Sequence, residues 1–170
     1  MTDETRILLK AIGWLLDYPG EDFDVRLDSV ERVLRELPST DVRDRLIEGA
    51  RSLAGMDAIV RQEEYTRLFD FNPGTTLELT YHRWGDAKER GTALAGLQRL
   101  YDETGWSPAG GELPDFLPRV LEFLSVAPAD VVQRLLDDFR PELSGLADRV
   151  AAASGAYGPI LAELPRVALD

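Results

Sequence analysis

Apolar residues recur along almost the whole chain with the period of an α-helix. Leucine, isoleucine, valine and aromatic residues return every three or four positions, the spacing that lines one face of a helix. The first stripe runs from Ile7 to Leu16 and ends before Pro19-Gly20, a pair that stops a helix. The same pattern predicts helices near 22–37, 40–55, 57–69, 86–101, 114–124, 128–139, 143–150 and 157–164.

Polar residues stand where several of these helices need a hydrogen-bond acceptor at the N-terminus. Ser39 or Thr40 is expected to cap the third helix, and Asp57 the fourth. Asp86, followed three positions later by Glu89, forms a capping-box pattern. We therefore expect Asp86 to cap the helix that follows it.

Two irregular segments interrupt the helices, at 71–85 and 105–112. The first opens with FNPGTT, a clear loop signal. Apolar residues then alternate with polar ones from Leu77 to Tyr81, which predicts a short extended stretch. Prolines are expected at later helix starts or breaks: Pro114, Pro128 and Pro141.

The chain shows no strand pair, internal repeat or low-complexity run. The sequence therefore predicts an all-α fold, a single-domain bundle of about eight or nine helices over residues 1–170. Within that domain, residues 141–168 contribute only a helical pattern.

The overall charge is strongly negative and changes which partners are plausible. The chain has 31 acidic and 19 basic side chains, a formal net charge of −12. Nucleic acids and anionic membranes are themselves polyanions, so both are disfavoured as partners. Such a balance favours a basic partner, or serves only to keep the surface solvated.

Targeting and thiol chemistry are also limited by the sequence. The chain has no cysteine, which excludes disulfides, thiolate metal sites and cysteine nucleophiles. The N-terminus begins with acidic residues and spaced apolar ones, unlike a signal peptide, and no window holds the roughly 20 apolar residues of a membrane helix. We expect a soluble, cytoplasmic protein.

Few residues in the sequence are candidates for catalysis. His82 is the only histidine, so a zinc site would need carboxylates for nearly all its other ligands. Neither HExxH nor GxxxxGK[ST] occurs, and no serine stands in a nucleophile elbow. Glu63 and Glu64 are adjacent and face apart on a helix, so they do not form an acid–base pair. We predict that the chain is not an enzyme.

Two stretches concentrate aromatic and charged residues. In QEEYTRLFDF, Tyr65, Leu68 and Phe69 share one helical face, which is typical of a core, while Glu64 and Asp70 are typical solvated charges. The alternative is that these residues line a binding site.

The second stretch, TYHRWGDAKER, allows a similar choice. Tyr81 and His82 either tie the loop to the helix behind it or face a ligand, and Trp84 either plugs the core edge or offers a contact face. Because one loop joins the two stretches, they can meet in space. Together they can form a groove with aromatic walls and an acidic rim, a geometry that suits a basic amphipathic helix.

The sequence EEYTRLFDFNPGTTLELTYHRWGDAKERGTALAGLQRLY resembles the signature of the NarJ-type nitrate reductase assembly chaperones, within the TorD-like redox enzyme maturation proteins. Two further stretches agree with this family in the same order: LLDYPGEDF at 15–23 and GELPDFLPRVLEFLS at 111–125. The similarity spans residues 7–139.

This resemblance implies an all-helical, non-catalytic chaperone in the cytoplasm. Such proteins bind the N-terminal segment of the catalytic, molybdenum-containing subunit of respiratory nitrate reductase. They support insertion of bis(molybdopterin guanine dinucleotide) into that apo-subunit, and the chaperone itself holds no cofactor stably. We also expect a monomer that binds no nucleic acid and does not insert into the membrane.

The resemblance also suggests which residues meet the client. Tyr65, Leu68 and Phe69 match the family's Tyr/Phe-x-x-Leu-Phe element, whereas the loop element from Tyr81 to Asp86 differs in order from that of the wider family. The residues expected to bind the client peptide are Glu64, Tyr65, Phe69, Asp70, Tyr81, His82, Trp84 and Asp86. Two alternatives stay open: a TorD-like chaperone for another molybdenum oxidoreductase, or a small nucleotide hydrolase, for which no phosphate-binding loop is visible.

Overall fold

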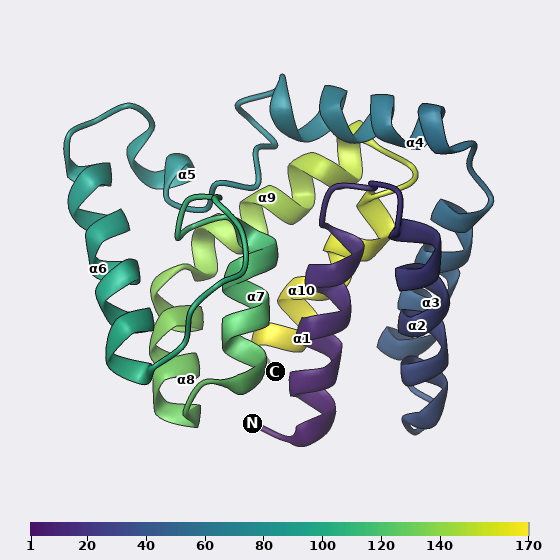
Figure 1. The fold of residues 1–170 in the computed structure, drawn as a ribbon, viewed down its shortest axis with the longest axis horizontal. Coiled ribbons are helices and arrows are strands. Elements are labelled where there is room, and N and C mark those ends of the chain that lie inside the picture. The colour runs from purple at the N-terminus through teal and green to yellow at the C-terminus, as the bar shows by residue number, and fades with distance from the viewer. Residues whose placement is uncertain (170) are drawn as a thin grey trace.

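The computed structural model describes residues 1–169, which form ten α-helices and one short π-helix joined by loops (Figure 1). The helices are α1 (Asp3–Leu15), α2 (Phe23–Glu36), α3 (Asp41–Ala54), α4 (Ala58–Tyr65), the π-helix η1 (Thr66–Asp70), α5 (Tyr81–Trp84), α6 (Glu89–Thr104), α7 (Leu117–Val126), α8 (Ala129–Asp138), α9 (Arg140–Ala153) and α10 (Gly158–Leu169). The predicted all-α fold is confirmed. The predicted domain extended to Asp170, which lies outside the described residues.

Two of the predicted N-caps are present. The Thr40 hydroxyl accepts a hydrogen bond from the backbone amide of Arg43 at 3.2 Å. The Asp57 carboxylate accepts from the amides of Ile59 and Val60 at 2.9 and 3.3 Å. Each side chain satisfies amides that have no partner inside the first helical turn, so these helices start where the local sequence predicts.

Of the predicted extended stretch from Leu77 to Tyr81, only a bridge at Glu78 is present, since Leu79 and Thr80 form a turn and Tyr81 begins α5; this bridge displaces a helix start. Glu78 and Phe116 form an isolated antiparallel bridge, and the amide of Leu117 donates to the carbonyl of Leu77 at 2.8 Å. The backbone just after Pro114 is therefore paired with another segment. For that reason α7 begins at Leu117, and the prediction of a helix start at Pro114 is wrong.

The prediction that Asp86 caps α6 is wrong as well. Within the described chain the N-cap of α6 is Lys88, which forms no side-chain cap bond, and the helix begins at Glu89. The physical reason is an extra turn upstream. Residues 81–84 form α5, and the chain leaves it through Gly85 in a left-handed conformation, with φ of +52°.

This short α5 brings the number of α-helices among the described residues to ten, above the expected eight or nine. Its turn continues past Gly85, because the amide of Ala87 donates to the carbonyl of Trp84 at 2.9 Å. A capping box read from the sequence assumes that the chain enters its helix directly, and here it does not.

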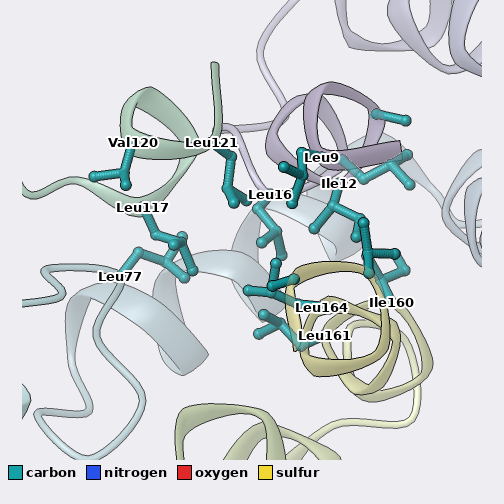
Figure 2. Packing of buried hydrophobic residues seen from close by; sticks show 14 of the residues in the cluster. Leu9, Ile12, Leu16, Leu77, Leu117, Val120, Leu121, Ile160, Leu161 and Leu164 are labelled. Atoms are coloured by element: carbon teal, nitrogen blue, oxygen red, sulfur yellow. The ribbon is translucent and has the colours of Figure 1, made fainter. Parts of the chain in front are cut away.

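The core is centred on α1, which packs against both α7 and α10. Figure 2 shows the side chains that meet there: Leu9 and Ile12 of α1 and Leu16 directly after it; Leu117, Val120 and Leu121 of α7; Ile160, Leu161 and Leu164 of α10; and Leu77. α2 and α3 pack on one side of this centre, while α6 and α8 lie on the other (Figure 1).

Two glycines allow the close helix contacts of this core. A Cβ added at Gly13 of α1 would lie 3.1 Å from the carbonyl oxygen of Pro118 on α7. A Cβ at Gly49 of α3 would lie 2.6 Å from Cγ1 of Ile160 on α10. Neither helix pair could approach so closely with a larger residue, since buried side chains are already close-packed.

Candidate functional site

Tyr65 and Phe69, two residues expected to bind the client, lie inside the core. Tyr65 is 2% exposed, and its hydroxyl donates to the carbonyl of Leu16 at 3.0 Å. Its ring contacts Tyr18, Phe69 and Tyr157 at centroid distances of 5.4, 4.9 and 5.9 Å. Burial raises the pKa of Tyr65 far above its usual value, so the hydroxyl stays protonated and keeps donating. Both rings stabilise the junction of α4 and α10.

Glu64 and Asp70 lie at the edge of this aromatic cluster. Glu64 forms an ion pair with Arg67 at 2.8 Å and accepts a hydrogen bond from the hydroxyl of Ser154 at 2.8 Å, which ties α4 to the end of α9. Asp70 is exposed at the end of η1, where partial burial of its carboxyl raises its pKa.

The π-helix η1 places Phe71 in solvent. The amide of Phe71 donates to the carbonyl of Thr66 at 3.1 Å, five residues back, and the Phe71 side chain is 80% exposed. The buried hydroxyl of Thr75 donates to the carbonyl of Leu68 and fixes the turn. π-helices are rare and concentrate at functional sites. Phe71 was not among the residues expected from the sequence, although an aromatic residue directly before the NPG loop is a usable signal.

His82 braces the loop that follows Phe71. Its Nε2 lies 2.8 Å from the carbonyl oxygen of Thr76, and its Nδ1 lies 3.0 Å from Nη2 of Arg149. Because arginine only donates, Nδ1 accepts and Nε2 carries the proton that is donated to Thr76. Arg149 also donates from Nε to the carbonyl of Gly74 at 2.6 Å. Burial, and then the charge of Arg149, lower the pKa of His82.

Arg83 fixes α5 to the junction of α8 and α9. Its guanidinium stacks over the rings of Trp84 and Phe139 at 4.9 and 4.7 Å. It pairs with Glu142 at 2.6 Å and with Asp138 at 3.0 Å. The Arg83 hydrogen bonds hold the pKa of Glu142 below its usual value. The sequence analysis did not single out Arg83.

Tyr81 belongs to a second polar cluster, which links the two irregular segments. The guanidinium of Arg90 lies 5.4 Å above its ring and bonds Glu78 at 2.5 Å and Thr80 at 3.1 Å. Asp115 is fully buried and accepts from both the amide and the hydroxyl of Thr80. The other Asp115 oxygen, Oδ1, has no partner among residues 1–169.

A groove lies between α6 and α8, and Arg83 and Trp84 of α5 line one part of it. Its volume is about 660 Å³. The lining residues are Arg83, Trp84, Glu89, Thr92, Ala93, Gly96, Leu97, Leu100, Val131, Arg134, Leu135, Asp138 and Phe139. Of the residues expected to bind the client, Trp84 alone lines this groove. The groove expected between the two aromatic-rich stretches stays a prediction.

The groove exists because α6 is only lightly packed. Within the 16 residues of α6, all of them described, Leu97 and Tyr101 are the buried ones. Ala93 and Leu100 are only partly buried and line the groove. A Cβ added at Gly96 would meet no described atom within 4 Å, so this glycine leaves open space at the groove.

The described residues contain neither a candidate metal-binding cluster nor a candidate membrane-spanning helix. Residues 1–169 contain no cluster of three or more histidine, cysteine, aspartate or glutamate side chains able to hold a metal ion. Within the same residues, no helix combines the length and apolar character needed to cross a bilayer.

Comparison with known proteins places these features in a family. The profile of the family described as nitrate reductase delta subunit matches residues 36–151. The chain is 28% identical to the probable nitrate reductase molybdenum cofactor assembly chaperone NarJ of Bacillus subtilis, over 94% of this chain and 87% of the relative. It is 33% identical to the Escherichia coli K12 chaperone of the same name, over 96% of this chain and 72% of the relative.

A solved structure resembles the whole fold. The crystal structure of a protein described as a redox enzyme maturation protein, from Archaeoglobus fulgidus, superposes with a TM-score of 0.72 at 25% sequence identity. The match covers 97% of this chain and 94% of that one. The arrangement of helices is therefore shared along nearly the full length.

Proposed function

Because the chain belongs to the nitrate reductase delta subunit family, we propose that it is an assembly chaperone for a nitrate reductase and binds the N-terminal segment of the catalytic subunit. The bound apo-subunit is held ready for insertion of bis(molybdopterin guanine dinucleotide). The chaperone acts in the cytoplasm as a monomer. The names of its relatives describe chaperones, in agreement with the prediction that the chain is not an enzyme.

The observation that carries this proposal is the groove between α6 and α8. Its apolar side chains come from both helices and from α5, and charged residues stand at its edges: Glu89, Arg134 and Asp138. A peptide that folds as an amphipathic helix buries one apolar face and leaves the other in solvent, so it fits a groove of this kind. A segment of about 20 residues would form a helix roughly 30 Å long.

Charge favours a basic segment. The net charge of −12 attracts cationic segments over a distance of about 8–10 Å at physiological salt. In the groove lining, Arg83 is already paired with Glu142 and Asp138, so its own charge repels a cationic segment little. Apolar contacts then supply most of the affinity, and the charges mainly speed capture. An assembly chaperone must also release its client, so a Kd of about 1 μM, near −8 kcal/mol, is expected.

The test is a titration with a peptide of the first 20 or so residues of the catalytic subunit, enough for about five helical turns. Trp84 lines the groove, and its fluorescence should change on binding. The variant Trp84→Phe keeps an aromatic side chain and should lose most of that signal, while calorimetry still detects binding. This control separates the groove from the other two tryptophans, Trp14 and Trp106.

The outcome decides between clients. Binding of the nitrate reductase peptide with a shift in Trp84 emission supports the proposal. If that peptide gives no heat and no fluorescence change, while a leader from another molybdenum oxidoreductase binds, the client has been assigned wrongly. If neither peptide binds, the chain does not recognise N-terminal segments.

A further inference from the structure

A second group of exposed apolar side chains lies on α4 and next to it, apart from the groove. We call it the α4 surface and define it by Tyr18, Ile59, Val60 and Phe71, which are 47%, 66%, 51% and 80% exposed. Figure 1 shows α4 lying across one end of the helical bundle, whereas α6 and α8 lie on the side of the bundle that is far from α4. The α4 surface and the groove have no lining residue in common.

The exposure of Phe71 is built into the backbone. The π-turn of η1 inserts one residue relative to an α-helix and turns Phe71 outward, while Leu68 and Phe69 stay buried. Two hydrogen bonds hold the loop after Phe71: one from His82 to the carbonyl of Thr76, and one from Arg149 to the carbonyl of Gly74. A large aromatic side chain held in solvent by a fixed turn has no role in stability, because it buries almost nothing.

Two shallow hollows flank the ridge formed by Glu63 and Arg67. The hollow of about 400 Å³ is lined by Tyr18, Ile59, Gln62, Glu63, Thr66, Arg67 and Phe71. The hollow of about 300 Å³ is lined by Met56, Val60, Glu63, Glu64, Arg67 and Ala156. Paired hollows beside an exposed ridge offer seats for apolar side chains that project from a partner at helical spacing.

The charges around the α4 surface are mostly negative and free to interact. Glu63 and Asp70 are exposed, and neither of them forms an ion pair with another described residue. The positive charge of Arg67 is already matched by Glu64 at 2.8 Å. The surface therefore presents apolar side chains bordered by unmatched carboxylates.

We propose that the α4 surface binds a cationic amphipathic helix, with Phe71 as its anchor and Glu63 and Asp70 as partners for lysine or arginine. Exposed aromatic residues are typical anchors of interfaces, and carboxylates around them select for basic partners. This site is separate from the groove and does not depend on the function proposed for it. A second copy of the chain fits poorly, since a symmetric dimer would bring the same carboxylates face to face.

The experiment uses a synthetic peptide of about 18 residues, five helical turns, with leucines at i, i+3, i+4 and i+7 and lysines elsewhere. A matched peptide carries glutamate in place of lysine. Binding to the full chain is followed by backbone amide NMR shifts and by calorimetry. We expect the lysine peptide to shift amides of residues 57–71 and the glutamate peptide to leave them unchanged.

Variants then locate the site. Phe71→Ser should lower the affinity for the lysine peptide by at least about tenfold, the loss expected when an interface anchor is removed. Val126→Ser is the matched control, because Val126 is 61% exposed at the end of α7 and should not alter binding. Gly96→Leu, which fills the groove, should leave the lysine-peptide shifts of residues 57–71 unchanged but weaken binding of the nitrate reductase peptide. Phe71→Ser should remove those shifts and leave binding of the nitrate reductase peptide unchanged.

Several results would overturn the proposal. Amide shifts confined to residues lining the groove would assign the lysine peptide to that site instead. Equal binding of the glutamate peptide would remove the role of charge. Unchanged affinity in Phe71→Ser would remove the anchor. Concentration-dependent dimerisation in sedimentation runs, abolished by Phe71→Ser, would identify the α4 surface as a contact between copies.

Discussion

Replacing Gly96 by leucine is expected to make the protein more stable and a poorer binder at once. Gly96 lies inside α6, where glycine disfavours the helix by about 0.8–1 kcal/mol relative to alanine, and leucine by much less. A Cβ added at this position meets no described atom within 4 Å, so the backbone here accepts a side chain that points into the open groove. The variant should gain about 0.5–1 kcal/mol in unfolding free energy, raising Tm by roughly 1–4 °C.

Binding should change in the opposite direction. The leucine side chain would occupy the part of the groove that Gly96 leaves open, so the client peptide would lose one apolar seat. Burying one leucine-sized side chain contributes about 1.5–3 kcal/mol, which corresponds to a loss of roughly 10- to 100-fold in affinity. Calorimetry with the nitrate reductase peptide measures the loss, and thermal unfolding measures the stability.

Gly91→Leu is the matched control. Gly91 also belongs to α6 and also has open space around its missing Cβ within the described chain, but it does not line the groove. This variant should keep wild-type affinity. If Gly96→Leu folds with raised stability yet binds the peptide as tightly as the wild type, the groove is not the client site.

Three further substitutions test the interior and the loop brace. Phe69→Ala should cost about 3–5 kcal/mol in urea unfolding, since Phe69 is 3% exposed among aromatic rings; a loss below about 1 kcal/mol would contradict its place in the core. The folded-state pKa of His82 is lowered, so its contribution to stability is present above about pH 6.5 and lost as pH falls through the lowered pKa. Between pH 7.5 and 5.5, the wild type should therefore lose more unfolding free energy than His82→Gln, and NMR of this single histidine should give a pKa below 6.5. Arg83→Lys keeps the charge but not the two-pronged bond to Glu142, and should lower stability by about 1 kcal/mol above pH 5, with an effect that shrinks as Glu142 is protonated.

Local sequence signals predicted most of the helices and some of their ends. Thr40 and Asp57 cap helices that the chain enters directly, so a pattern of three or four residues is enough. Asp86 satisfies the same kind of pattern, but it does not cap a helix. Gly85 changes the direction of the chain just before it, and Arg90 of α6 is bound to Glu78 and Thr80. A one-dimensional pattern does not contain those tertiary contacts.

The candidate site was harder to predict than the fold. Periodicity correctly placed Tyr65 and Phe69 on an inward face, and the structure buries both. The groove arises between α6 and α8, which are far apart in the sequence, so no single stretch announces it. Its clearest local trace is the presence of small residues, Ala93 and Gly96, on a helix whose other inward residues are large. The binding roles assigned to His82 and Asp86 stay predictions.

The bridge between Glu78 and Phe116 has a consequence for how this protein can change over evolution. It pins both ends of an excursion that contains α5, α6 and the loop after α6. The excursion supplies one wall of the groove, whereas the centre of the core is built from α1, α7 and α10. A replacement excursion that keeps Thr80 and Asp115, the residues that close its base, should graft onto the same scaffold. Exchange of this cassette between relatives is then a direct route to a chaperone that accepts a different leader.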